Sequence, residues 1–176
     1  NIGSIKGLLK AGFHKEGIAK KNVKINGRWE DHQTLAIVKE EQTDQVKPKV
    51  QRKNPGTVAP PMGPYTHLTV VPKGADLLIL SGQVGMDLHG ELPTNMKEQV
   101  ENTLQNILRN FESESVTADH IIKINIWATE QMDWKHFNQV WEKFHGGTPP
   151  AMTMSYVPSL AVPSLKVEIE ALAAKW

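Results

Sequence analysis

The sequence predicts an α+β domain over residues 54–176, in which one mixed sheet is covered on one face by two helices. Three observations support this fold class. Short β-rich runs are bounded by glycine and proline, two longer segments carry apolar residues at helical spacing, and these two kinds of segment are interleaved along the chain. The expected order is strand, strand, helix, strand, helix, strand, strand.

The first strands are expected between residues 67 and 81. This segment contains the β-rich runs LTVV and LLIL, separated by the turn residues PKGAD, and we interpret it as a hairpin. A helix is expected over residues 95–112, where apolar residues recur at spacings of three and four. They are Val100, Leu104, Ile107, Leu108 and Phe111.

The second half repeats the alternation of strand and helix. Residues 121–127, with the sequence IIKINIW, are expected to form a strand, and a helical stripe then runs until Gly146. We assign that stripe to core packing; it contains Trp134, Phe137, Val140, Trp141 and Phe144. Two final strands are expected at 152–157 and 165–173. Because the helices cover one face only, the other face is expected to be buried by self-association.

Composition restricts the classes of function. The formal charge is +1, so no global field favours nucleic acid or an anionic membrane, and neither is an expected partner. No apolar run reaches the roughly 18–20 residues of a membrane span. The chain has no cysteine, which fits a reducing compartment, and a cytoplasmic location is expected. The seven histidines show no metal-ligand spacing, and no metal or cofactor is expected.

Several motifs, in order and in register, carry a resemblance to a known family. They are PPMGPYTHL (60–68), ILSGQVGMD (79–87), NMKEQVENTLQNILRNFES (95–113), KINIWATE (123–130), TPPAMT (148–153) and KVEIEALA (166–173). Residues 54–176 resemble the YjgF/RidA family of reactive-imine deaminases. The resemblance implies a chorismate-mutase-like fold and a homotrimer in which the sheets form a central barrel. It also implies ligand clefts at the subunit boundaries.

The resemblance also implies a set of site residues. Glu168 is expected to position the attacking water as a general base would. The expected substrate-binding residues are Tyr65, Ser81, Gly82, Gln83, Trp127, Met152 and Met154. The deaminases hold the substrate carboxylate with an arginine at the position of Met152, which has no hydrogen-bond donor. The arginines of this chain are Arg28, Arg52 and Arg109.

One expected function is a true deaminase that holds the substrate carboxylate with another group of the cleft, and two other functions compete with it. One is a protein that binds a small organic acid or an imine-like metabolite, with 2-imino acid hydrolysis impaired by the loss of the arginine. Its thioether-lined cleft would favour apolar or aromatic acids. The alternative is a non-catalytic regulatory module attached to an acetyltransferase.

That alternative comes from the N-terminal residues. Residues 1–41 contain GFHKEG and NGRWED, and they resemble the last helix and hairpin of a GCN5-related N-acetyltransferase. A helix and a hairpin are too small to bury a core of their own. The charged, proline-bearing residues 42–53 are interpreted as a linker.

Overall fold

The structure is a computed structural model that describes residues 2–37 and 49–176. It divides into two compact units, Asn1–Val46 and Lys47–Trp176, and each is considered by itself.

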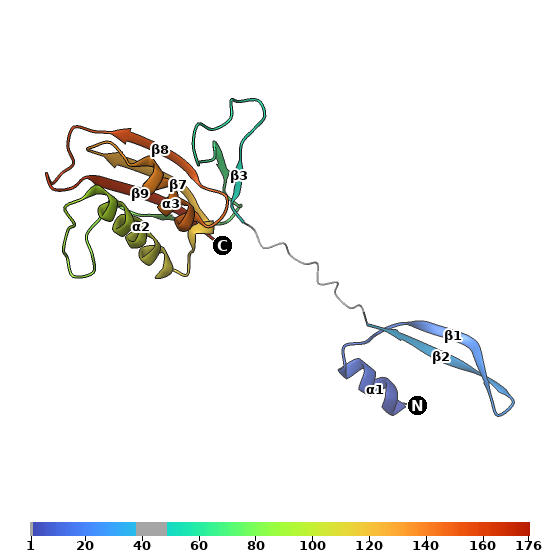
Figure 1. The fold of residues 1–176 in the computed structure, drawn as a ribbon. Coiled ribbons are helices and arrows are strands. Elements are labelled where there is room, and N and C mark those ends of the chain that lie inside the picture. Colours follow the sequence, from blue (N-terminus) through green and yellow to red (C-terminus); the bar gives the residue numbers. More distant parts are fainter. Residues whose placement is uncertain (1, 38–48) are drawn as a thin grey trace. The chain divides into compact units, whose positions relative to one another are not determined.

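The N-terminal unit is a helix followed by a β-hairpin (Figure 1). Helix α1 (Ile2–Lys10) leads into strand β1 (His14–Ile25), which pairs antiparallel with β2 (Arg28–Ala36). The connection is Asn26-Gly27, and both residues have positive φ, as a tight two-residue hairpin turn requires.

A five-stranded mixed sheet organises the second unit. Its strands are β5 (Asp76–Ile79), β6 (Gln83–Val84), β7 (Ile121–Ala128), β8 (Ala151–Tyr156) and β9 (Val167–Lys175). The order is β5-β9-β7-β8, with β6 also pairing with β9. Strands β7 and β8 are parallel and the other pairs are antiparallel. The mixed α+β sheet predicted from the sequence is therefore confirmed.

Two helices pack on one face of this sheet, also as predicted (Figure 1). Helix α2 (Met96–Glu112) begins after the N-cap Asn95, whose side chain accepts a hydrogen bond from the backbone N–H of Glu98. Helix α3 (Trp134–His145) ends at Gly146, which has φ +63° as a left-handed C-cap requires.

The core between helices and sheet follows the predicted stripes with one exception. The buried helical residues include Val100, Leu104, Ile107, Phe111, Phe137, Trp141 and Phe144. Trp134 was expected to belong to this core, but it is 46% exposed. It is the first residue of α3, and its ring packs edge-on against that of Phe137, with the centroids 5.7 Å apart.

The predicted hairpin over residues 67–81 is wrong. Strand β4 (Leu68–Val70) pairs with β3 (Gln51–Lys53), whereas β5 pairs with β9. The turn between β4 and β5 therefore moves the chain from one sheet to another. Turn residues indicate where a strand ends, but the choice of partner depends on long-range burial. Leu78 of β5 lies opposite the buried Ala173 of β9.

The C-terminal end of the predicted linker 42–53 includes strand β3 (Gln51–Lys53). Val50, just before the strand, is buried and Arg52 is partly buried, whereas Gln51 and Lys53 are exposed. The strand was not predicted because the segment is highly charged and one of its partly buried positions is an arginine, so no alternation of apolar and polar residues is visible. The predicted linker residues 42–48 lie outside the described residues.

Candidate functional site

A hollow of about 650 Å³ lies beside the edge strand β8. The loop before β4, the start of α3 and β8 itself provide its walls. The lining residues are Met62, Gly63, Pro64, Tyr65, Trp134, Asn138, Met152, Thr153 and Met154. The structure thus brings together three of the residues predicted from the sequence, namely Tyr65, Met152 and Met154.

Hydrogen bonds hold the Tyr65 loop against β8. The indole Nε1 of Trp141 donates to the carbonyl of Pro64 at 2.7 Å, which ties the loop to the buried face of α3. On the other side of Tyr65, Thr66 forms a parallel β-bridge with Ala151. Its backbone N–H donates to Pro150 O at 3.2 Å, and its hydroxyl donates to Pro149 O at 3.1 Å. The residues before and after Tyr65, Pro64 and Thr66, are therefore both held by hydrogen bonds.

A second group of predicted residues lies around Glu168. In the antiparallel β7–β9 pair, Glu168 is directly opposite Trp127. Gly82 lies against the same carboxylate, because a Cβ on Gly82 would be 1.8 Å from Glu168 Oε1. Glu168, Trp127 and Gly82 form one contiguous surface.

The methionines of the first group and the residues of the second group lie on opposite faces of the sheet. Met152 and Met154 pack against the core on the helix-covered face. Trp127 and Glu168 alternate with the buried Ile126 and Ile169, so they project from the open face. In a single copy of the chain, Glu168 is therefore separated from the side chains of Met152 and Met154 by the sheet.

Ser81 and Gln83 have a structural arrangement that the sequence did not predict. The side-chain amide of Gln83 donates to Ser81 O at 3.1 Å, and its Oε1 accepts a hydrogen bond from Asn110 Nδ2, also at 3.1 Å. The Gln83 side chain is thereby bound to α2, and the backbone of the Ser81–Gln83 segment lies beside Glu168.

Trp134, Asn138 and Met62 were missed as lining residues. Trp134 and Asn138 are four residues apart on α3, so they face the hollow together. The spacing of Trp134 from Phe137 placed it in the apolar stripe, and its position in the first turn is the signal that separates it from the core residues. Met62 is 99% exposed in a loop, and no pattern in the sequence identifies it.

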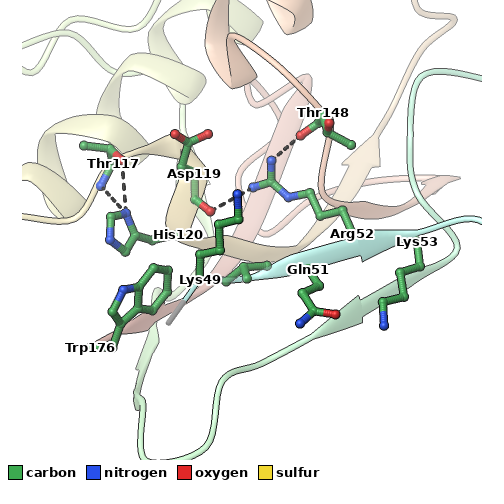
Figure 2. Close-up of a pocket in the computed structure, with 10 residues that line it drawn as sticks. Lys49, Gln51, Arg52, Lys53, Thr117, Asp119, His120, Thr148 and Trp176 are labelled. Carbon is green, nitrogen blue, oxygen red and sulfur yellow. Dashed lines mark hydrogen bonds between the residues drawn. The ribbon is translucent and has the colours of Figure 1, made fainter. Parts of the chain in front are cut away.

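None of the chain's three arginines, Arg28, Arg52 and Arg109, lines the hollow beside β8. Arg52 reaches from β3 toward the 3₁₀ turn Ala118–His120 and toward Thr148, as Figure 2 shows. Its guanidinium donates to Ala118 O at 2.9 Å, to Ile121 O at 2.8 Å and to Thr148 O. Burial lowers the pKa of Arg52, and these carbonyls accept hydrogen bonds from its Nη1 and Nη2, whereas its buried Nε has no partner among the described residues.

The remaining two arginines are also placed elsewhere. Arg109 donates to Asn106 Oδ1 within α2, and Arg28 belongs to the N-terminal unit. Arg52 instead borders a second hollow of about 640 Å³ together with Lys49, Lys53 and Trp176 (Figure 2).

One cation does contact a lining residue of the hollow beside β8. Lys123 Nζ donates to Thr153 Oγ1 at 2.6 Å across the parallel β7–β8 pair. Partial burial lowers the pKa of Lys123 from its ordinary value of 10.5.

The part of the chain that the structure describes contains no group of three or more acidic or histidine side chains arranged to hold a metal ion. Within residues 2–37 and 49–176, no helix has the length and apolar character that crossing a membrane requires.

The domain is of the α+β class: two helices cover one face of a mixed sheet, and a hollow lies beside its parallel edge strand β8. Residues 56–175 match the family model described as Endoribonuclease L-PSP. The chain belongs to this family, which is the YjgF/RidA family that the sequence motifs resemble.

Individual relatives agree with this assignment. The chain is 32% identical over 118 residues to a RutC family protein of Buchnera aphidicola, a match that covers 65% of this chain and 90% of the relative. The structure of Escherichia coli TdcF with bound serine is similar with a TM-score of 0.53 and 28% identity. That match covers 66% of this chain and 91% of TdcF.

A short match to a different protein accompanies these. Over 38 residues, 22% of this chain, the identity to the probable N-acetyltransferase YjcK of Bacillus subtilis is 76%. The chain spans only 21% of the length of that relative. We assign the match to the N-terminal unit, which carries the acetyltransferase-like motifs.

Proposed function

We propose that the chain binds a small organic acid in a cleft formed between copies of the RidA-like domain, with 2-imino acid hydrolysis impaired by Met152. The observation that supports this most is the division of the site. Met152 and Met154 lie on the helix-covered face of the sheet and Glu168 on the open face, which supports a cleft that takes one group from each of two copies.

The open face of the sheet supports self-association. Ile79 is 68% exposed and Leu77 is 55% exposed, and both lie on the strand that pairs with the end of β9. Exposed apolar residues of this kind are typical of an interface between copies. A homotrimer, as the family resemblance implies, would cover them and would bring Glu168 of one copy toward the Tyr65 hollow of the next.

The residues that line the hollow beside β8 support one class of ligand. TdcF, a relative in this family, was solved with bound serine, which carries a carboxylate. In the present chain, Met152 and Met154 contribute thioethers where a carboxylate-binding guanidinium would be needed. Tyr65 and Trp134 add aromatic surface to the same hollow. We therefore propose a small acid with an apolar or aromatic side chain as the preferred ligand.

Substitution of Met152 by arginine tests this proposal. Each charge-assisted hydrogen bond contributes about 1.5–3 kcal/mol, so Met152→Arg is expected to raise the affinity for 2-oxobutyrate by roughly 10- to 100-fold. Imine turnover is expected to rise with it. Met152→Leu is the matched control, because it keeps the apolar volume without adding a donor. Isothermal titration and an imine hydrolysis assay measure the two effects.

Wild-type turnover equal to that of an arginine-bearing relative would contradict the proposal. So would tight wild-type binding of 2-oxobutyrate without binding of larger apolar acids.

A second candidate function is a fully active deaminase in which Lys123 holds the substrate carboxylate. Its contact with Thr153, a residue of the hollow, is the observation that favours it. Under this alternative, Lys123→Met abolishes imine turnover while the wild type is fully active. Under the leading proposal, the wild type is already impaired and Lys123→Met changes little.

A further inference from the structure

The hollow beside β3 differs in chemistry from the hollow beside β8. Its volume of about 640 Å³ lies within the range of small-molecule sites. Within the residues that the structure describes, the two hollows share no lining residue. The lining residues that determine the chemistry of the hollow beside β3 are Lys49, Arg52, Lys53, Asp119, His120 and Trp176.

Positive charge predominates in this hollow. Lys49, Arg52 and Lys53 contribute three positive charges, and among the described lining residues Asp119 contributes one negative charge. Across the two described stretches of the chain, none of these three cations forms an ion pair. The excess of positive charge matches a phosphate monoester, which carries a charge of about −1.5 to −2 at neutral pH. A carboxylate, with a single charge, would leave part of that excess uncompensated.

Arg52 contributes its charge to the hollow rather than a hydrogen bond. Its Nη1 and Nη2 already donate to backbone carbonyls, and its Nε is buried. Because carbonyls are neutral, the guanidinium keeps a full positive charge that is partly withdrawn from water. A bound anion interacts more strongly with such a charge than with one in bulk solvent. Lys49 and Lys53 are exposed, so their amines are able to donate directly to a phosphate oxygen.

Trp176 and His120 provide an aromatic wall to the same hollow (Figure 2). Their ring centroids are 4.5 Å apart and the ring planes are inclined by 30°. Trp176 is 38% exposed, so part of its indole is available to a ligand. The backbone N–H of Thr117 donates to Nδ1 of His120 at 3.2 Å, so Nε2 carries the proton of the neutral imidazole and is a donor. Aromatic side chains beside cations are the arrangement on which a nucleic-acid base stacks while its phosphate is neutralised.

We propose that this hollow binds a small phosphate monoester that carries an aromatic ring, of which a nucleoside monophosphate is the common form. Lys49 and Lys53 hold the phosphate in the field of Arg52, and the ring lies against Trp176. This site is independent of the ligand cleft proposed between copies of the domain, because the two hollows have different lining residues.

Titration of the 176-residue chain with AMP tests the proposal. Trp176 lines this hollow and Trp134 lines the hollow beside β8, so the indole N–H signals in nuclear magnetic resonance spectra distinguish the two sites. We expect AMP to shift the Trp176 signal but not the Trp134 signal. The expected dissociation constant is roughly 10–100 μM at low salt, and it rises with ionic strength. Inorganic phosphate lacks the ring and adenosine lacks the charge, so each is expected to bind at least about tenfold more weakly.

Substitutions separate the contributions of charge and ring, with affinities measured by isothermal titration. Lys49→Gln and Lys53→Gln each remove one charge and are expected to weaken AMP binding about three- to tenfold. Trp176→Ala is expected to weaken AMP binding about tenfold and to leave the binding of inorganic phosphate unchanged, whereas Trp176→Phe retains most of the affinity for AMP. Lys135→Gln is the matched control, because it removes the same charge at an exposed position of α3 that lines neither hollow. Melting temperatures show whether each variant is folded.

Two further ligands identify the source of the aromatic phosphate. Binding of phenyl phosphate as well as AMP supports aromatic phosphates in general, and binding of AMP alone supports a nucleotide. A short oligoadenylate that binds more than about tenfold tighter than AMP at the same salt concentration overturns the proposal in favour of a nucleic-acid strand.

Four other results also overturn the proposal. They are the absence of AMP binding at about 1 mM in low salt, inorganic phosphate binding as tightly as AMP, a shift of the Trp134 signal in place of the Trp176 signal, and unchanged AMP affinity in folded Lys49→Gln and Lys53→Gln variants.

Discussion

The glycine beside Glu168 offers a direct test of the site. A Cβ at Gly82 would be 1.8 Å from Glu168 Oε1, 2.7 Å from Cδ and 2.8 Å from Cγ. Real Cβ atoms essentially never approach another heavy atom closer than 3.0 Å. In Gly82→Ala the carboxylate oxygen must therefore move from 1.8 Å to at least 3.0 Å, a displacement of at least 1.2 Å.

A displacement of this size in Gly82→Ala is expected to lower turnover but not stability. Misplacing a catalytic group by about 1 Å reduces turnover by about 100-fold, and we expect that loss for Gly82→Ala. Stability should change little, because the clash involves the end of a flexible side chain. Imine hydrolysis, measured in the wild type and in the Met152→Arg background, reports the first effect, and the melting temperature reports the second.

Gly85→Ala is the matched control. Its Cβ would be 2.4 Å from the Cα of Gln99, so the clash is with the backbone of α2 rather than with a mobile carboxylate. We expect Gly85→Ala to lower the free energy of unfolding by about 1–3 kcal/mol or more. If Gly82→Ala retains turnover within threefold of its parent and is fully folded, Glu168 has no role in catalysis.

Three further predictions concern the framework of the RidA-like domain. Arg52→Met removes four hydrogen bonds to backbone carbonyls, and urea unfolding should show a loss of about 2–4 kcal/mol, with Arg52→Lys intermediate. Asn95→Ala removes the cap on the N–H of Glu98 and should cost about 1 kcal/mol, seen as a melting temperature lower by roughly 3 °C, whereas Asn95→Asp should retain stability. The hydrogen-bonded ion pair with Lys97, followed by the hydrogen bond from the backbone N–H of His136, lowers the pKa of Asp133 below its ordinary 3.8. This stabilisation is present above pH 3.8 and is lost as the pH falls through the folded-state pKa, so Asp133→Asn should remove that part of the acid dependence in a stability-against-pH series.

The sequence was sufficient to predict the elements that are determined locally. The stripe of α2 and the Gly146 stop of α3 depend on spacing and on single-residue conformational preference, and both are confirmed. Strand pairing was not predictable in the same way. The turn after β4 is compatible with a hairpin, and only the distant β9 determines that β5 pairs elsewhere.

The arrangement of the candidate site also depends on strand pairing, which the local sequence does not determine. The family resemblance predicts that Tyr65, Met152 and Glu168 line one cleft, but motifs do not specify from which face of a sheet, or from which copy, a side chain comes. The alternation of buried and partly buried residues along β9 provides that information once its strand partners are known. Arg52 was not predicted as a framework residue because its partners are backbone carbonyls. Every residue has such a carbonyl, so the sequence does not identify the ones that accept from Arg52.

The placement of Met152 and Glu168 on opposite faces of the sheet has a consequence for how ligand binding responds to dilution of the protein. Under the proposed assembly, a ligand that contacts both groups is also a contact between two copies of the chain. Ligand affinity and subunit association are then linked, and each strengthens the other by mass action. The concentration of the protein itself becomes a variable that sets the occupancy of the cleft.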